Sequence, residues 1–212
     1  MSNRPQRDLT PLEAAGFAVP GTWMVLGLFL DGWSHRHQRL DSFFTPWHAT
    51  LYSGFVAAMV WGAWSRYRLT ATDPESAARP VAGDRVTTIG LALFAIGAPL
   101  DFAWHQMFGI EASIKALLSP THLLLMTGGV LAATGPVRAA WAMSTTRRPS
   151  WREFAPVLVA MTLAVAVLSF FTQEINAFTL DSVDLRVQGN HPAIQQQGIA
   201  AVLITSALMM GA

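Results

Sequence analysis

The chain has 212 residues, of which 52% are hydrophobic and only 13% are charged, a composition too apolar for an ordinary soluble domain and typical of an integral membrane protein. Its formal net charge of +1 gives no broad basic surface, which excludes nucleic acid as an expected partner. Cysteine is absent, so disulfides, thiolate metal sites and cysteine nucleophiles are excluded together. Any metal site must therefore be built from nitrogen and oxygen ligands.

Six apolar segments follow one another along the chain, each close to the roughly 20 residues that a helix needs to cross a bilayer. They span residues 14–34, 46–65, 87–108, 119–140, 154–174 and 192–212. The sequence therefore predicts an all-α fold, a polytopic membrane helix bundle of about six transmembrane helices in contact with lipid. We expect residues 1–212 to form a single integral membrane domain.

The basic residues are distributed unevenly between the two sets of connecting segments. Ten of the fourteen precede the first apolar segment or follow the second and the fourth, at Arg4, Arg7, Arg66, Arg68, Arg79, Arg85, Arg138, Arg147, Arg148 and Arg152. The other connections hold the remaining four, at Arg36, Arg39, Lys115 and Arg186. Because cytoplasmic loops carry the excess of Lys and Arg, we expect both termini to be cytoplasmic and the second group of loops to face outward.

Acidic and histidine side chains gather where the first apolar segment ends and the second begins. Asp31 and His35 are four residues apart, which on a helix places a carboxylate and an imidazole on one face, one turn apart. Pro46 then opens the next helix, where its missing N–H costs nothing, and His48 falls in that helix's first turn. Two helix ends therefore offer three metal ligands to one point.

The same pattern returns about seventy positions later in the chain. Asp101 and His105 repeat the four-residue spacing, and Pro120 and His122 repeat the proline and histidine at the start of a helix. Each copy thus carries its own Asp/His/His set, and the sequence predicts a second metal site that is separable from the first.

A third, incomplete copy of this hairpin is indicated near the end of the chain. Glu174 and His191 are separated by the same seventeen residues as the two histidines of the second copy, while Phe170 stands where the aspartate would be. Recurrence at a fixed period indicates internal duplication, with pseudo-repeats at about 14–65, 87–140 and 154–212. The acidic loop between Glu174 and His191 is long enough to act as a lid.

Two further carboxylates, Asp41 and Glu111, lie close to these sets in the sequence. They fit a supporting role better than direct coordination, because ligand histidines commonly donate their other ring N–H to a carboxylate. A simpler interpretation of the whole pattern is that the aspartates form salt bridges with the histidines or with Arg36 and Arg39. We favour a metal site, because the histidine after each proline recurs without any structural need for an imidazole.

Spacing alone does not choose the metal, since histidine and carboxylate ligands suit zinc, copper, iron and manganese. The run Asp41-Ser-Phe-Phe-Thr-Pro-Trp-His48, with Asp31 and His35 before it, resembles the copper-binding run of the C subunit of particulate methane and ammonia monooxygenases. The second copy, with Asp101-Phe-Ala-Trp-His105-Gln and Pro120-Thr-His122, is similar to that family's nearby second copper site.

This resemblance implies a function and a set of ligands. It implies an all-helical membrane subunit of a bacterial or archaeal inner membrane, with copper sites near the outer face that are candidates for oxygen activation and C–H or N–H hydroxylation. By resemblance the copper ligands are Asp31, His35 and His48 in one site and Asp101, His105 and His122 in the other. Further monooxygenase subunits or a homo-oligomer are the implied partners.

Four hypotheses for the function remain open at this point. The first is a copper-dependent monooxygenase subunit that oxidises a small apolar molecule, with no catalytic acid or base assigned to the protein. The second is a membrane protein that binds or delivers metal without turnover, and the third is a b-type haem protein with paired histidine ligands. An ion-coupled carrier is the fourth, although its site is expected near mid-membrane rather than at helix ends.

Overall fold

The computed structural model describes residues 10–37, 42–79, 84–109, 117–142, 148–172 and 202–207, together with residues 7, 81, 199 and 210. Every named element in that part of the chain is a helix: α1 (Pro11–His37), α2 (Pro46–Thr72), α3 (Pro74–Ala77), α4 (Asp84–Phe108), α6 (Pro120–Ala133), α7 (Gly135–Ala142) and α8 (Trp151–Phe171). The prediction of an all-α fold is confirmed for these residues. The predicted pair Glu174 and His191, and most of the predicted sixth segment, lie outside them.

Four stretches of the described chain are long and apolar enough to cross a membrane: Leu12–His35, Arg85–Phe108, Pro120–Ala142 and Trp151–Phe171. They correspond to the first, third, fourth and fifth predicted segments. The second predicted segment does form a helix, α2, but it is not among these candidate spans. Its first two turns carry His48, Thr50, Tyr52 and Ser53, and these polar groups lower its hydropathy. The described part thus supports a membrane protein with four candidate spans, and the count of six stays a prediction.

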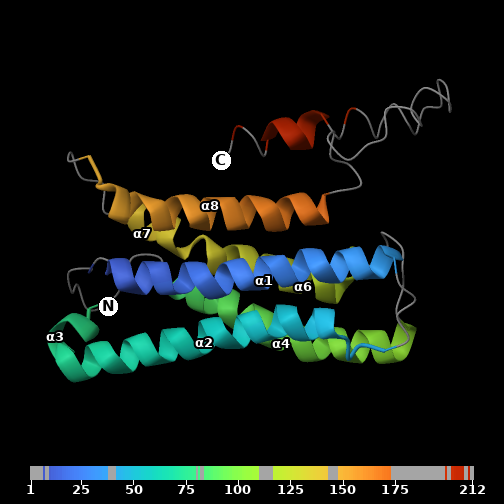
Figure 1. Ribbon diagram of the computed structural model, residues 1–212, viewed down its shortest axis with the longest axis horizontal. Coiled ribbons are helices and arrows are strands. Elements are labelled where there is room, and N and C mark those ends of the chain that lie inside the picture. Colours follow the sequence, from blue (N-terminus) through green and yellow to red (C-terminus); the bar gives the residue numbers. More distant parts are fainter. Residues whose placement is uncertain are drawn as a thin grey trace.

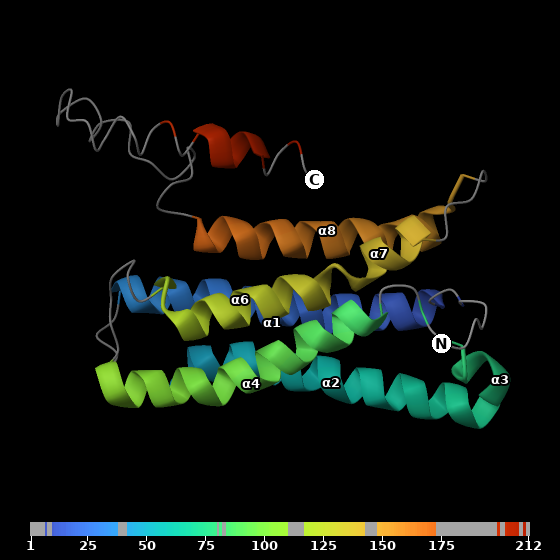
Figure 2. The same ribbon diagram turned by 180° about the vertical axis from the view of Figure 1, so that it is seen from behind.

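The long helices lie side by side with their axes nearly aligned, so that two helical hairpins face each other (Figures 1 and 2). α1 packs on α2, α4 packs on α6, and α8 packs on α1 and α6. The C-terminal ends of α1 and α4 and the N-terminal ends of α2 and α6 meet at one end of the bundle, on the right in Figure 1. All four helix ends that carry the predicted ligands therefore reach the same region.

Glycines bring α1 and α2 into close contact. A Cβ atom at Gly27 would lie 2.6 Å from the backbone nitrogen of Leu51, and one at Gly54 would lie 2.7 Å from the backbone nitrogen of Met24. Real Cβ atoms do not approach backbone this closely, so only glycine fits at either position. Small residues of this kind let two helix backbones approach within a membrane.

The α4–α6 hairpin makes the corresponding contacts. Gly97 stands four residues before Asp101, as Gly27 does before Asp31, and its Cβ would lie 2.9 Å from the side chain of Leu125. A Cβ at Gly128 would lie 2.7 Å from the backbone nitrogen of Phe94. Counted from the aspartate and the histidine of each hairpin, these positions match those of the first hairpin. The two hairpins therefore present their aspartates and histidines in the same way.

A pair of neighbouring glycines in α6 provides a test of this packing. We expect Gly128→Ala to destabilise the folded protein by about 1–3 kcal/mol relative to Gly129→Ala, because the first adds a methyl group against backbone and the second places it 3.9 Å from the ring of Phe94, an ordinary contact. Both changes carry the same gain in helix propensity, so the difference isolates the clash. Unfolding by a denaturing detergent measures it, and equal stabilities of the two variants would contradict the close approach.

The space between the hairpins is filled by apolar side chains just below the ligand-bearing ends. Leu51, Phe94 and Leu125 form a buried cluster that joins α2, α4 and α6. On the other side of α1 and α6, Val167, Phe170 and Phe171 of α8 form a second cluster. These clusters fix the four helix ends relative to one another.

Candidate metal centre

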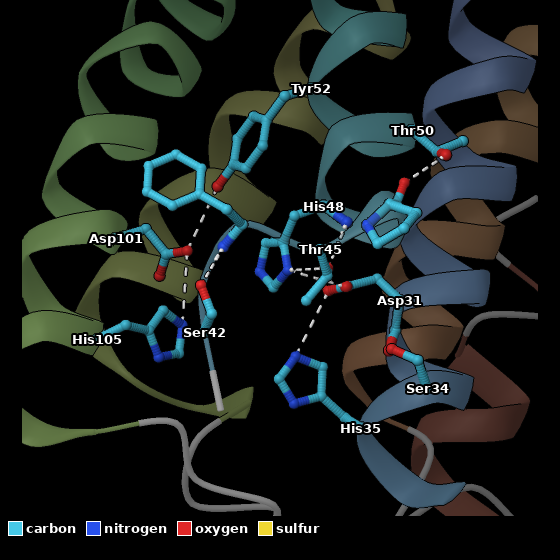
Figure 3. Close-up of polar contacts among 12 residues, drawn as sticks. Asp31, Ser34, His35, Ser42, Thr45, His48, Thr50, Tyr52, Asp101 and His105 are labelled. Carbon is cyan, nitrogen blue, oxygen red and sulfur yellow. Dashed lines mark hydrogen bonds and ion pairs between the residues drawn. The ribbon is translucent and has the colours of Figure 1, made fainter. Parts of the chain in front are cut away.

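The first predicted set converges at the ends of α1 and α2. Asp31 Oδ1 lies 3.1 Å from His48 Nδ1, and Asp31 Oδ2 lies 3.7 Å from His35 Nε2 (Figure 3). One donor atom from each of the three residues lies within 4.8 Å of the others. The helical spacing of four residues and the return of the chain through α2 thus bring the carboxylate and both imidazoles to one point.

Local structure at the start of α2 positions His48. Thr45 is the N-cap residue, and its hydroxyl accepts a hydrogen bond from the His48 backbone N–H at 3.1 Å. The same Thr45 oxygen lies 3.1 Å from His48 Nδ1. Pro46 takes the first helical position, where a backbone N–H is not needed. Backbone and ring of His48 are therefore both fixed by one N-cap side chain.

The second predicted set is built in the same way at the ends of α4 and α6. Asp101 Oδ2 lies 3.7 Å from His105 Nε2, and Asp101 Oδ1 lies 3.2 Å from His122 Nε2. Ser119 is the N-cap of α6 and accepts a hydrogen bond from the His122 backbone N–H at 3.2 Å. Ser119 thus plays the part of Thr45 in the other hairpin.

The two sets adjoin each other. His48 forms a second group with Asp101 and His105, again with donor atoms within 4.8 Å of one another. The ring centroids of His35, His48, His105 and His122 follow each other at separations of 5.7, 6.3 and 5.5 Å. The sequence predicts two separable sites, whereas the structure places the two ligand sets side by side in one cluster.

Both carboxylates are buried: the exposed fraction is 8% for Asp31 and 1% for Asp101. A buried carboxylate needs partners, because its desolvation is costly. Asp101 has them, since Thr121 Oγ1 donates to Oδ1 at 2.9 Å and Tyr52 Oη donates to Oδ2 at 3.3 Å. Sequence reasoning missed these two hydroxyl residues. Their positions carried a signal: Thr121 precedes His122, and Tyr52 lies one helical turn after His48.

Two potential ligand atoms in the cluster are buried and make no hydrogen bond to any described residue: Asp31 Oδ1, which has an ion-pair contact with His48 Nδ1 at 3.1 Å, and His105 Nε2, which lies 3.7 Å from Asp101 Oδ2. The other ring nitrogen of His105, Nδ1, lies 3.3 Å from the Gly109 carbonyl oxygen. A carbonyl can only accept, so Nδ1 carries the proton, and in the neutral ring Nε2 presents a lone pair to the cluster. A bound cation would satisfy both atoms. The residues present therefore fit a metal ion with nitrogen and oxygen ligands.

Aromatic side chains enclose the cluster between the hairpins. The ring of Phe43, from the segment before α2, lies 4.6 Å from that of His48 and 5.8 Å from that of His105. It also contacts Tyr52 at 5.9 Å and Phe102 at 5.2 Å. This apolar cover keeps water from the donors and strengthens their interaction with a cation.

Other residues that the sequence singled out lie elsewhere. His37 is exposed and stacks on Trp33 at 4.8 Å between centroids, so it takes no part in the cluster. Asp41 and Glu111, predicted to support the ligand histidines, lie outside the described residues. Among the described residues, Asp31 pairs with His35 and His48, and Asp101 pairs with His105 and His122, so the simpler interpretation of aspartate–histidine salt bridges also fits this geometry. Arg39 and the side chain of Arg36 lie outside the described residues.

Comparisons with protein-family models, with curated proteins and with solved structures found no match for this chain. The resemblance to a monooxygenase subunit therefore rests on the motif residues alone.

Proposed function

We propose that this chain is a copper-binding membrane protein, related to the C subunit of particulate methane and ammonia monooxygenases, that oxidises a small apolar substrate with O₂. The observation that carries the proposal is a cluster of two aspartates and four histidines at adjoining helix ends, in which Asp31 Oδ1 and His105 Nε2 make no hydrogen bond to any described residue. A buried polar atom without a hydrogen bond is costly unless a cation binds it.

Copper is favoured over other metals by the ligand chemistry and by the motif resemblance. Imidazole ligands suit copper, zinc and iron, and among divalent ions affinity for such a site is highest for copper. When bound, copper supplies the one-electron chemistry that lets O₂ react with a C–H or N–H bond. Zinc lacks redox chemistry and would leave the chain a binding protein without turnover.

The protein's residues have three roles in the proposed site: they bind the metal ion, orient its ligands and shield the ligands from water. With a metal ion bound, Asp31 would supply negative charge beside it, and the histidine nitrogens would supply neutral lone pairs. Thr121 and Tyr52 hold the Asp101 carboxylate through both of its oxygens, which fixes the direction in which it meets a metal. Phe43 excludes water above His48 and His105. No side chain in this arrangement needs to act as a general acid or base.

The four histidines of the cluster differ in exposure. The side chains of His35 and His122 are each 20% exposed, whereas those of His48 and His105 are nearly inaccessible. The two outer histidines therefore mark the accessible edges of an otherwise closed cluster.

Activity in a lipid bilayer tests the proposal. The protein is reconstituted with copper, a reductant and a short alkane or ammonia, alone and with candidate partner subunits, and the oxidised product is measured. We expect product with the wild type, none above background with His35→Ala, and wild-type yield with His37→Ala, because His37 is exposed and away from the cluster.

The alternatives give different results in the same preparation. Stoichiometric copper with no product above the His35→Ala control under any combination would favour metal binding or delivery and would end the enzyme assignment. A strong visible absorption from bound porphyrin, with no copper, would favour the b-type haem protein.

We also propose that the chain crosses a bacterial or archaeal inner membrane six times, with both termini in the cytoplasm. The excess of arginine at the end of the bundle opposite the cluster supports this orientation. The cluster then lies near the outer face of the membrane.

Cysteine labelling checks the orientation, and the chain has no native cysteine to interfere. Ser42→Cys, at an exposed site before α2, is expected to react with an impermeant reagent from outside the cell. Thr72→Cys, exposed at the other end of α2, is expected to react only after the membrane is opened. The reverse pattern would overturn the proposed orientation.

A further inference from the structure

His48 occupies a special place in the cluster because it belongs to both groups of potential ligands. It lies with Asp31 and His35 in one group and with Asp101 and His105 in the other. Its ring meets those of His35 and His105 edge-on, at interplanar angles of 71° and 82°. The side chain is almost fully buried, so its position between the hairpins is fixed.

The two nitrogens of the His48 ring face different hairpins. Nδ1 is turned towards Asp31 on α1, and the other ring nitrogen is turned to the side where Asp101 and His105 of α4 lie (Figure 3). Each nitrogen of an imidazole can bind a metal ion when it presents a lone pair. A single ring in this orientation can therefore serve two ions.

We propose that the cluster is one two-ion centre in which His48 bridges the ions, Nδ1 binding the ion held by Asp31 and His35 and Nε2 binding the ion held by Asp101 and His105. This rests on the proposed metal-binding function. Coordination through both nitrogens displaces the single N–H proton of the ring, which leaves to solvent as the second ion binds. His122, whose Nε2 lies 3.2 Å from Asp101 Oδ1, completes the second position.

Charge balance favours one centre with a bridging His48 rather than two independent sites. Two divalent ions in a buried cluster bring a large positive charge, and two carboxylates alone offset only half of it. The deprotonated ring adds a third negative charge between the ions, where it is most stabilising. Coordination through Nδ1 would replace the contact between that nitrogen and Thr45 Oγ1. The Thr45 oxygen would keep its hydrogen bond from the backbone N–H of His48, so the helix cap would remain.

Electron paramagnetic resonance during a Cu(II) titration of the whole protein in lipid tests the bridge, with metal analysis to count the bound ions. We expect two copper ions per chain, and a signal that grows with the first ion and falls as the second binds, because a bridging imidazolate couples the two spins antiferromagnetically. His122→Ala is expected to weaken the second position and to leave the uncoupled signal of the first. His37→Ala, at an exposed position outside the cluster, is expected to behave as the wild type.

The outcomes separate this inference from the proposed function. Two bound ions with the full signal of two isolated spins would overturn the bridge and leave copper binding intact. No bound copper in a protein with full helical circular dichroism would overturn both. His48→Ala is expected to bind at most one ion and to show no coupling, and if that variant does not fold, the wild-type titration alone decides.

Discussion

Asp31→Asn is expected to lower copper affinity by more than the roughly 10–100-fold that loss of a supporting partner of a ligand typically costs. The change keeps the size of the side chain but removes the negative charge that lies 3.1 Å from His48 Nδ1. Among the described residues, this carboxylate has ion-pair contacts with the rings of His35 and His48 only. Competition against a copper chelator measures the affinity, and an unchanged value would contradict a role for Asp31 as a ligand.

The stability of the metal-free protein distinguishes Asp31 from Asp101. Asp31→Asn removes an incompletely satisfied buried charge, so we expect the metal-free variant to be at least as stable as the wild type. Asp101→Asn disturbs hydrogen bonds from Thr121 and Tyr52 to a charged group, each worth about 1.5–3 kcal/mol, so the metal-free variant is expected to be less stable. An equal loss of stability in the two metal-free variants would contradict this difference between the two carboxylates.

Phe43→Ala is expected to destabilise the protein by about 3–5 kcal/mol, the usual cost of emptying a phenylalanine site in a core. The ring is buried and contacts His48, His105, Tyr52 and Phe102, which belong to α2 and α4. Its removal opens a cavity between the hairpins and admits water to the ligands. Detergent unfolding of the metal-free protein measures the loss.

The next residue provides the control. Phe44 is 79% exposed, so Phe44→Ala in the same segment is expected to change stability by no more than about 0.5 kcal/mol. Phe43→Leu should recover most of the loss, because it refills much of the volume. A Phe43→Ala variant as stable as Phe44→Ala would contradict the placement of Phe43 between the hairpins.

The parts of the site that could be predicted from sequence are those set by local geometry. A four-residue spacing on a helix places Asp31 beside His35 whatever the rest of the chain does, and a proline at the start of a helix places His48 in its first turn. The spacing rule applies equally to Asp101 and His105, and the proline rule applies to His122 in the second hairpin. Apolar segment length likewise indicated the helices themselves.

The relation between the hairpins could not be predicted, because it depends on contacts between distant residues. The place of His48 beside Asp101 and His105 follows from how α2 packs next to α4, which no spacing within one copy encodes. The expectation of two separable sites treated each copy alone and stays a prediction, while the structure places His48 in both groups of potential ligands. Tyr52 was passed over for the same reason, since its hydroxyl serves an aspartate of the other hairpin.

The sequence also could not predict which individual glycines contact a neighbouring helix. Gly128 and Gly129 are adjacent and look equivalent in the sequence. Only the three-dimensional arrangement shows that a Cβ at Gly128 would meet backbone, whereas one at Gly129 would meet the edge of a ring. The two glycines differ because only Gly128 lies on the face of α6 that contacts the backbone of α4.

Copper content and copper X-ray absorption of the purified protein, compared between the wild type and His48→Ala, test the central claim most directly. We expect copper bound by nitrogen and oxygen ligands with the scattering of imidazole rings, and loss of at least one of the two copper ions per chain in His48→Ala while the helical content is unchanged. A folded wild-type protein that takes up no copper, or a His48→Ala variant that binds copper as the wild type does, would contradict it.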